Sequence, residues 1–169
     1  QILNKLTKFF VREGRECHLL DFGCGNGSIF PTLRKFFPNW SLYGLEIAER
    51  ELDSVFTSSV ESIFFGDIEN LPLTFDLITL FHVLEHSIDC KSLLIKLREK
   101  LNPGGMLILQ IPDWTSNPFD LTIVDHVNHF NINSLKTIVE AAGFEILVGG
   151  DNIVSKEFTF LVRRTSTEV

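Results

Sequence analysis

Three glycines stand at alternate positions, Gly23, Gly25 and Gly27, directly after an apolar run that contains Asp21. Glycine allows left-handed backbone conformations and lets a ligand approach the main chain closely. A helix that follows such a turn begins with unpaired N–H groups, which favour anionic or polar ligands. The spacing therefore predicts a ligand-binding turn between a strand and a helix. The alternative is a turn that is merely rich in glycine.

Two carboxylates lie at the ends of the next two apolar runs. Glu46 is near the end of "LYGLEI", and Asp67 follows "SIFFG". Ionised carboxylates only accept hydrogen bonds, so they suit a ligand that presents hydroxyl or amino groups. The structural alternatives are a solvated charge at a strand end for Glu46 and a turn residue for Asp67.

Four of the five histidines fall into two clusters. His82 and His86 follow the run "FDLITLF", and His126 and His129 precede the segment "NSLKTIVEAAGF". A histidine can take a proton from an acceptor hydroxyl or carbon near neutral pH. The structural alternative is that these side chains cap the following helix or pack beside Phe130.

The elements that must position these residues alternate along the chain. Apolar runs predict strands at 17–22, 40–47, 62–66, 75–81, 106–111, 144–149 and 158–164. Helical spacing of apolar residues predicts helices at 2–11, 28–37, 48–56, 89–101 and 134–142. The fold class is therefore α/β, a Rossmann-like three-layer sandwich with a seven-stranded, mostly parallel sheet and an antiparallel last strand. Ligands of such sheets bind outside the carboxyl ends of the strands, where all these residues lie.

The net charge, the apolar runs and the cysteines of the chain limit its expected partners and location. The formal net charge is −7 and no cluster of Lys and Arg interrupts it, so nucleic acid is not an expected partner. No apolar run approaches the roughly 18 residues of a membrane span. The three scattered cysteines indicate a reduced, cytoplasmic protein rather than a disulfide framework.

The spacing of the glycines distinguishes between two kinds of nucleotide-binding motif. A dinucleotide fingerprint requires G-x-G-x-x-G, but counted from Gly23 its third position is Ser28. The stretch "LLDFGCGNG" instead resembles the first motif of class I S-adenosylmethionine-dependent methyltransferases. The segments "LYGLEI", "FFGDIENLP", "FDLITLFHVLEH" and "LNPGGMLILQIPD" resemble their later motifs in the same order. The resemblance covers roughly residues 15 to 150.

This resemblance implies S-adenosylmethionine as cofactor and S-adenosylhomocysteine as product. Glu46 would hold the ribose hydroxyls, Asp67 the adenine amine, and Asp21 the region of the methionine amino group. The cofactor-binding residues that it implies are Asp21, Gly23, Cys24, Gly25, Glu46, Ile47, Asp67, Ile68 and Phe81.

The resemblance also bears on the methyl acceptor. Related enzymes that methylate base or amide nitrogens commonly carry an Asn/Asp-Pro-Pro-aromatic stretch where this chain has "FHVLEH". That segment is typical of the small-molecule branch, similar to quinone-precursor and sugar methyltransferases, and predicts an oxygen or carbon acceptor. "DHVNHF" resembles a base-bearing segment of these relatives, so His126 is the first candidate base, followed by His129 and His82.

A metal site is the sharper alternative for the first histidine cluster, which contains His82 and His86. Some relatives hold a divalent ion through an E-x-x-E-H stretch, and "HVLEH" matches it with His82 in place of the first Glu. His129 or Asp125 would complete the set. Because of that departure, we expect no metal.

We expect a single methyltransferase domain over 1–169, with a short N-terminal helix over 1–13 that is truncated, since the chain begins at Gln1. An acceptor-site insertion is predicted at about 112–130. Two other classes remain, a non-catalytic S-adenosylmethionine-binding subunit and a nicotinamide-dependent oxidoreductase. The sequence leaves the oligomeric state open.

Overall fold

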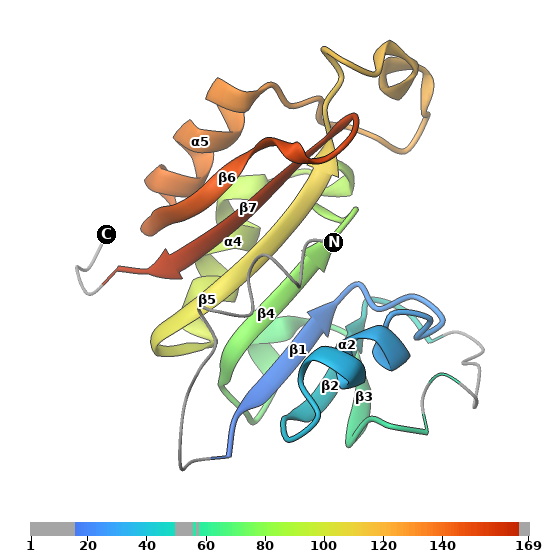
Figure 1. Cartoon of the computed structure of the whole chain (residues 1–169), viewed down its shortest axis with the longest axis vertical. Helices are drawn as coiled ribbons and strands as arrows, with labels where there is room; N and C mark the ends of the chain where they lie inside the picture. Colours follow the sequence, from blue (N-terminus) through green and yellow to red (C-terminus); the bar gives the residue numbers. More distant parts are fainter. Residues whose placement is uncertain (1–15, 50–55, 57, 166–169) are drawn as a thin grey trace.

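The computed structural model of the protein describes residues 16–49, 56 and 58–165. A seven-stranded sheet in the order β3-β2-β1-β4-β5-β7-β6 runs through these residues (Figure 1). Its strands are β1 (His18–Phe22), β2 (Ser41–Glu46), β3 (Ser62–Phe65), β4 (Phe75–Phe81), β5 (Leu101–Pro112), β6 (Phe144–Val154) and β7 (Glu157–Arg164). The pairs β1–β2, β1–β4, β2–β3 and β4–β5 are parallel, and β7 is antiparallel to both β5 and β6.

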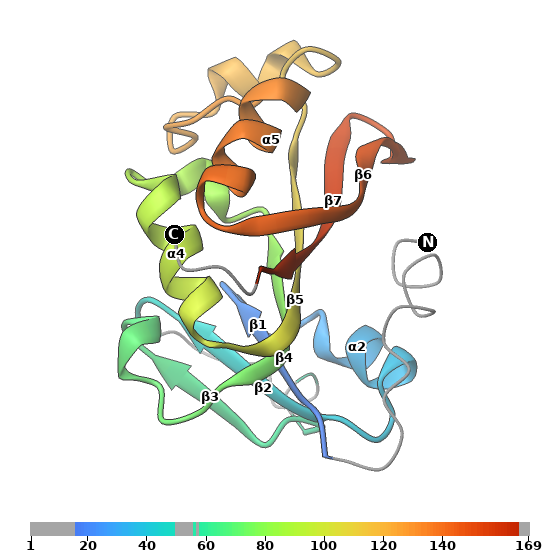
Figure 2. The same ribbon diagram turned by 90° about the vertical axis from the view of Figure 1, so that its left-hand side faces the viewer.

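Helices cover both faces of the sheet. α2 (Phe30–Phe36) lies on one face, and α4 (Cys90–Glu99) and α5 (Ile132–Ala141) lie on the other (Figure 2). Three short 3-10 helices, η2 (Ile68–Asn70), η3 (Leu84–His86) and η4 (Pro118–Thr122), follow strand ends. This arrangement confirms the predicted Rossmann-like three-layer sandwich. The predicted helix over 2–11 lies outside the described residues, and the one over 48–56 lies mostly outside them.

Neighbouring residues of the central strands bury their side chains on opposite faces. Leu19 of β1 pairs with Leu77 of β4, and both pack toward the α2 side. The next pair, Leu20 and Ile78, packs toward the α4 side. All four side chains are fully buried. The near-continuous apolar runs in the sequence are therefore explained by a sheet that is covered twice.

The boundary between α4 and β5 differs from the prediction. The helix ends at Glu99, and β5 begins at Leu101, well before the expected start at Met106. Leu101 pairs with Phe75, and regular pairing resumes only at Met106 after an irregularity in the register. The "NPGG" sequence is therefore a distortion within the strand rather than a separate helix stop.

The parallel strands end at one edge of the sheet, and the segment between β5 and α5 lies beyond this edge (Figure 1). The glycine turn follows β1, η2 follows β3, and η3 follows β4. The fold thus brings together four chain segments that the sequence separates. Among the described residues, no helix has the length and apolar character to cross a membrane.

Candidate active site

The glycine turn after β1 adopts backbone conformations that other residues rarely reach. The φ angles are +76° at Gly23, +56° at Gly25 and +87° at Gly27. A Cβ atom on Gly23 would lie 2.5 Å from Cγ2 of Val83, in the segment after β4. Glycine is therefore required at position 23 by conformation and by close packing.

Cys24 lies within this turn. Its side chain is buried and packs against β2. A Cβ atom added to Gly44 of β2 would lie 2.8 Å from the Sγ atom of Cys24. Its carbonyl accepts a hydrogen bond from the N–H of Gly27 at 2.9 Å. Cys24 thus packs between the turn and β2, and it also lines the cavity that contains Asp21.

Glu46 at the end of β2 is bound to the glycine turn. Its Oε2 accepts a hydrogen bond of 2.8 Å from the N–H of Gly25, and its Oε1 accepts one of 3.3 Å from the N–H of Ile47. The carboxylate is 9% exposed and lines a cavity together with Phe22 and His86. The sequence prediction placed Glu46 in the cleft, but not its bond to Gly25.

Asp67 and Ile68 line an adjoining cavity beyond β3. Asp67 precedes η2 and is exposed, whereas Ile68 is buried beneath it. Ile47 is 72% exposed and lines both this cavity and the one that contains Glu46. The two apolar side chains and the carboxylate thus line one cavity beyond β3.

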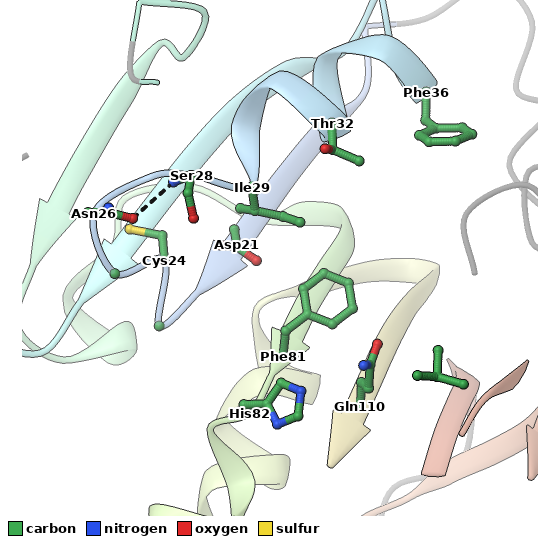
Figure 3. Close-up of a pocket in the computed structure, with 13 residues that line it drawn as sticks. Asp21, Cys24, Asn26, Ser28, Ile29, Thr32, Phe36, Phe81, His82 and Gln110 are labelled. Carbon is green, nitrogen blue, oxygen red and sulfur yellow. Dashed lines mark hydrogen bonds between the residues drawn. The ribbon is translucent and has the colours of Figure 1, made fainter. Parts of the chain in front are cut away.

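Asp21 lies at the other end of the cleft, in a cavity of about 530 Å³. Figure 3 shows its carboxylate facing Phe81 beneath the glycine turn. Burial raises the pKa of Asp21 to about 7, helped by the nearby charge of Glu46, although a hydrogen bond of 2.5 Å from the Thr79 hydroxyl acts in the opposite direction. Thr79 was not predicted, because only the pairing of β1 with β4 places it beside Asp21.

His82 follows β4 directly and lines the same cavity (Figure 3). Its φ angle is +54°, an unusual value for a residue with a side chain. Nδ1 lies 3.4 Å from Oε1 of Glu85, and Nε2 lies 3.4 Å from Oε1 of Glu157. Glu85 raises the pKa of His82, with Glu157 adding to the effect and burial opposing it. The two carboxylates therefore favour the imidazolium form, which has no lone pair to accept a proton.

The two histidines of the segment between β5 and α5 share one carboxylate. Nδ1 of His126 lies 2.6 Å from Oδ1 of Asp120, and Nδ1 of His129 lies 2.7 Å from Oδ2. Asp120 is 1% exposed, and no motif or spacing in the sequence distinguishes it from other acidic residues. The cavities described above are lined by His82 and His86 but not by His126 or His129.

His86 stands between His126 and the cleft. The two rings pack edge to face with centroids 4.7 Å apart, and Nδ1 of His86 lies 2.9 Å from the carbonyl oxygen of Asp125. One ligand atom each from Glu85, His86 and His126 fall within 4.8 Å of one another. This set differs from the one expected with His129 or Asp125, because η3 turns Glu85 and His86 toward His126.

A sequence profile described as a methyltransferase domain matches residues 1–148 of the 169. The chain belongs to this methyltransferase family. S-adenosylmethionine is the cofactor of the family, and the resemblance to class I methyltransferases is confirmed by sequence and by fold.

Two relatives illustrate the range of the methyltransferase family. The mitochondrial ubiquinone biosynthesis O-methyltransferase of Schizosaccharomyces pombe is 32% identical over 120 residues, which are 64% of this chain and 43% of that protein. The trans-aconitate 2-methyltransferase of Deinococcus radiodurans is 33% identical over 104 residues, 60% of this chain and 40% of that protein. The chain thus spans about two fifths of the length of these relatives.

Solved methyltransferase structures share the fold at low identity. An S-adenosylmethionine-dependent methyltransferase from Clostridium acetobutylicum has a TM-score of 0.72 and 16% identity, covering 98% of this chain and 89% of that chain. The O-methyltransferase of neocarzinostatin biosynthesis, solved with S-adenosylmethionine and 2-hydroxy-5-methyl naphthoic acid, has a TM-score of 0.71 and 17% identity. It covers 88% of this chain and 49% of that chain.

Proposed function

We propose that this methyltransferase transfers the methyl group of S-adenosylmethionine to an oxygen or carbon atom of a small molecule. The observation that carries the proposal is the order of three carboxylates along one continuous cleft. The cavity of Asp21 and the cavity of Glu46 share Gly23, Gly25 and His82 as lining residues. The cavity of Glu46 in turn shares several lining residues, Ile47 among them, with that of Asp67.

The three carboxylates match three donor groups of the cofactor in sequence. Asp21 faces the methionine ammonium, Glu46 the ribose hydroxyls, and Asp67 the adenine amine. Each pairing joins an acceptor-only group to a donor, and the ammonium pairing is also charge-assisted. In this binding mode Phe81, at the end of β4, and His82 would line the part of the cavity that holds the sulfonium end of the cofactor.

Methyl transfer breaks the bond between sulfur and the methyl carbon and forms a bond from that carbon to the acceptor. The cofactor already carries its leaving group, so alignment of acceptor, methyl and sulfur is the main task of the protein, worth up to about 7–11 kcal/mol in favourable systems. A hydroxyl or carbon acceptor must also lose a proton. A positioned base adds roughly 10²–10⁴-fold to the rate of such a step.

His126 is the base in this proposal, and His86 separates it from the cleft. The acceptor proton goes to Nε2 of His126, whose ring packs edge to face on His86 at the edge of the cleft. His82 has a different role, because its two carboxylate neighbours favour the imidazolium. In that form both of its N–H groups are directed to these carboxylates, and its positive charge lies beside the cavity that contains Asp21.

The small-molecule acceptor is supported by the two relatives whose names state an acceptor or a pathway, ubiquinone biosynthesis and trans-aconitate. The segment 112–130 supplies the acceptor side of the site, since it lies beyond the strand ends of the cleft. Three buried cysteines outside any disulfide fit a cytoplasmic location. The acidic net charge of −7 fits an acceptor other than nucleic acid.

Two measurements test the proposed function. Titration calorimetry with S-adenosylmethionine and with NAD should show binding of the first alone, and the reverse result would favour an oxidoreductase. Transfer of a radiolabelled methyl group should then be followed with catechols, hydroxylated acids, a tricarboxylate and nucleotide sugars. Binding of S-adenosylmethionine without transfer to any acceptor would favour a non-catalytic binding subunit.

A further inference from the structure

We propose that Asp120 is a positioning residue that sets the tautomer of both His126 and His129. It holds the proton of each neutral ring on Nδ1 and so leaves the lone pair of each on Nε2. The inference rests on the proposed function only for its effect on rate. The tautomers themselves can be measured without any substrate.

The contact geometry restricts the protonation pattern. The two oxygens of Asp120 each lie within hydrogen-bond distance of one Nδ1 atom, at 2.6 Å for His126 and 2.7 Å for His129. An ionised carboxylate accepts hydrogen bonds and cannot donate them. If either ring carried its proton on Nε2, a nitrogen lone pair would face a carboxylate oxygen at that distance. Both rings must therefore donate from Nδ1.

Burial makes this restriction strong. The Asp120 side chain is 2% exposed and that of His126 is 10% exposed, so water does not replace either bond easily. A buried carboxylate is costly unless hydrogen-bond donors satisfy it. Each imidazole supplies one donor, its Nδ1–H, to one oxygen of Asp120. The preference for the Nδ1–H tautomer is large because losing either donor would leave a buried carboxylate oxygen without a partner. His129 is more open, with 28% of its side chain exposed.

The surrounding segment holds the arrangement against the cleft. Asp120 belongs to η4, near the middle of the segment that connects β5 and α5, whereas the two histidines lie near its end. The N–H of Asn128 donates to the carbonyl of Glu85 at 3.0 Å, and its side-chain amide donates to the carbonyl of Ser87 at 2.5 Å. These bonds anchor the end of the segment to η3. Asp120 then orients the rings relative to this anchor.

The Asp120→Asn variant separates tautomer control from a purely structural role. An asparagine side chain presents one acceptor oxygen and one donor NH₂ at nearly the same positions. It can bond to both rings only if one of them moves its proton to Nε2 and accepts from the amide. The variant should therefore convert one histidine, and not both, to the Nε2–H tautomer. Asp120→Glu keeps two acceptor oxygens and should leave both rings as Nδ1–H.

The readout is the ring ¹⁵N chemical shifts of labelled protein, recorded at about pH 9, where an ordinary histidine is neutral. Single His126→Asn and His129→Asn variants assign the signals. Asp125→Asn is the matched control, because this exposed carboxylate lies in the same segment but contacts His86, and it should leave both tautomers unchanged. A wild-type His126 or His129 with its proton on Nε2 would overturn the proposal, and this outcome can be read even if Asp120→Asn does not fold.

The effect on rate is measured with whichever acceptor class the wild-type protein methylates. When His126 is the ring that switches, Asp120→Asn should lower kcat by about 10²-fold with little change in affinity for S-adenosylmethionine, whereas Asp120→Glu should keep kcat near the wild-type value. An unchanged kcat with His126 switched to Nε2–H would overturn the positioning role, and so would a large loss of kcat with only His129 switched. Absence of transfer by the wild-type protein would refute the proposed function instead, while the tautomer result would stand.

Discussion

The Oε2 atom of Glu46 accepts a hydrogen bond of 2.8 Å from the main-chain N–H of Gly25, and this bond joins the end of β2 to the glycine turn. The N–H of Ile47 holds the other oxygen at 3.3 Å. The carboxylate is thus oriented by the backbone on both sides. Each oxygen retains acceptor capacity for the hydroxyls of a ribose.

Replacing Glu46 should therefore reduce the affinity for the cofactor more than it reduces the stability of the fold. We expect Glu46→Ala to reduce the affinity for S-adenosylmethionine by about ten- to a hundredfold, because charge-assisted hydrogen bonds to the ribose are lost. Glu46→Gln is the matched control, since it keeps one acceptor oxygen and should lose less. Titration calorimetry measures both. An unchanged affinity in Glu46→Ala would show that the ribose is held elsewhere.

Gly25 should tolerate no side chain when the cofactor binds. At φ of +56°, any other residue costs roughly 1–2 kcal/mol, and a branched side chain would also occupy the approach to the turn. Gly25→Val should remain folded and fail to bind S-adenosylmethionine. Gly25→Ala carries the same backbone strain with less bulk, so it separates the two causes. Normal binding by Gly25→Val, with a native circular dichroism spectrum, would mean that the turn does not contact the ligand.

The fold was predictable because its signal is local and repeated. Each strand is an apolar run, and each helix in the described residues shows one apolar face, so the order of elements can be read from the sequence. The cofactor residues were predictable because they sit at fixed places after those strands. The "NPGG" distortion was not, because its conformation depends on pairing between Leu101 and Phe75.

The contacts within the site were harder to predict, for a physical reason. Thr79 meets Asp21 only through strand pairing, Glu157 reaches His82 from the far hairpin, and Asp120 meets two histidines through the path of a long connection. No spacing rule governs such contacts. A carboxylate that will be buried looks the same in sequence as one that will face water.

Asp21 should make the stability of the fold depend on pH. Its pKa of about 7 in the folded protein, against an ordinary value of 3.8, means that the folded state holds the proton more tightly than the unfolded state across this interval. The contribution of Asp21 to stability therefore falls as pH rises from about 4 to 7 and is constant above that. Removal of the carboxylate in Asp21→Asn should abolish this part of the pH dependence of Tm.

The ammonium of S-adenosylmethionine should favour the ionised form of Asp21. Binding at about pH 6 should then release close to one proton, whereas at about pH 9 Asp21 is already ionised and releases none. Calorimetry in two buffers of different ionisation enthalpy measures this number directly. Asp21→Asn should show no release at either pH. Equal proton release by wild type and variant would place the ammonium away from Asp21.

Methyl transfer should be independent of divalent metal ions. Glu85 and His86 gather with His126, but His82, which stands where relatives have a first Glu, forms an ion pair with Glu85 at 3.4 Å. The raised pKa of His82 favours a positive charge beside Glu85, in the place of a bound cation. EDTA should leave the rate unchanged. His82→Glu should create a site for Zn²⁺ or Mn²⁺ that calorimetry detects, and metal binding by the wild-type protein at the same concentrations would contradict this prediction.

His126 should matter for turnover rather than for cofactor binding. Its ring is held by Asp120 and packs on His86, which lies between it and the cleft. An asparagine at this position therefore removes the proposed base without contacting the cofactor residues. We expect His126→Asn to lower kcat by roughly 10²-fold or more, with nearly constant affinity for S-adenosylmethionine. His129→Asn is the matched control, because it shares the carboxylate but does not pack on His86, and it should lose less. If kcat holds in His126→Asn while Tm falls, His126 is a packing residue and alignment alone carries the reaction.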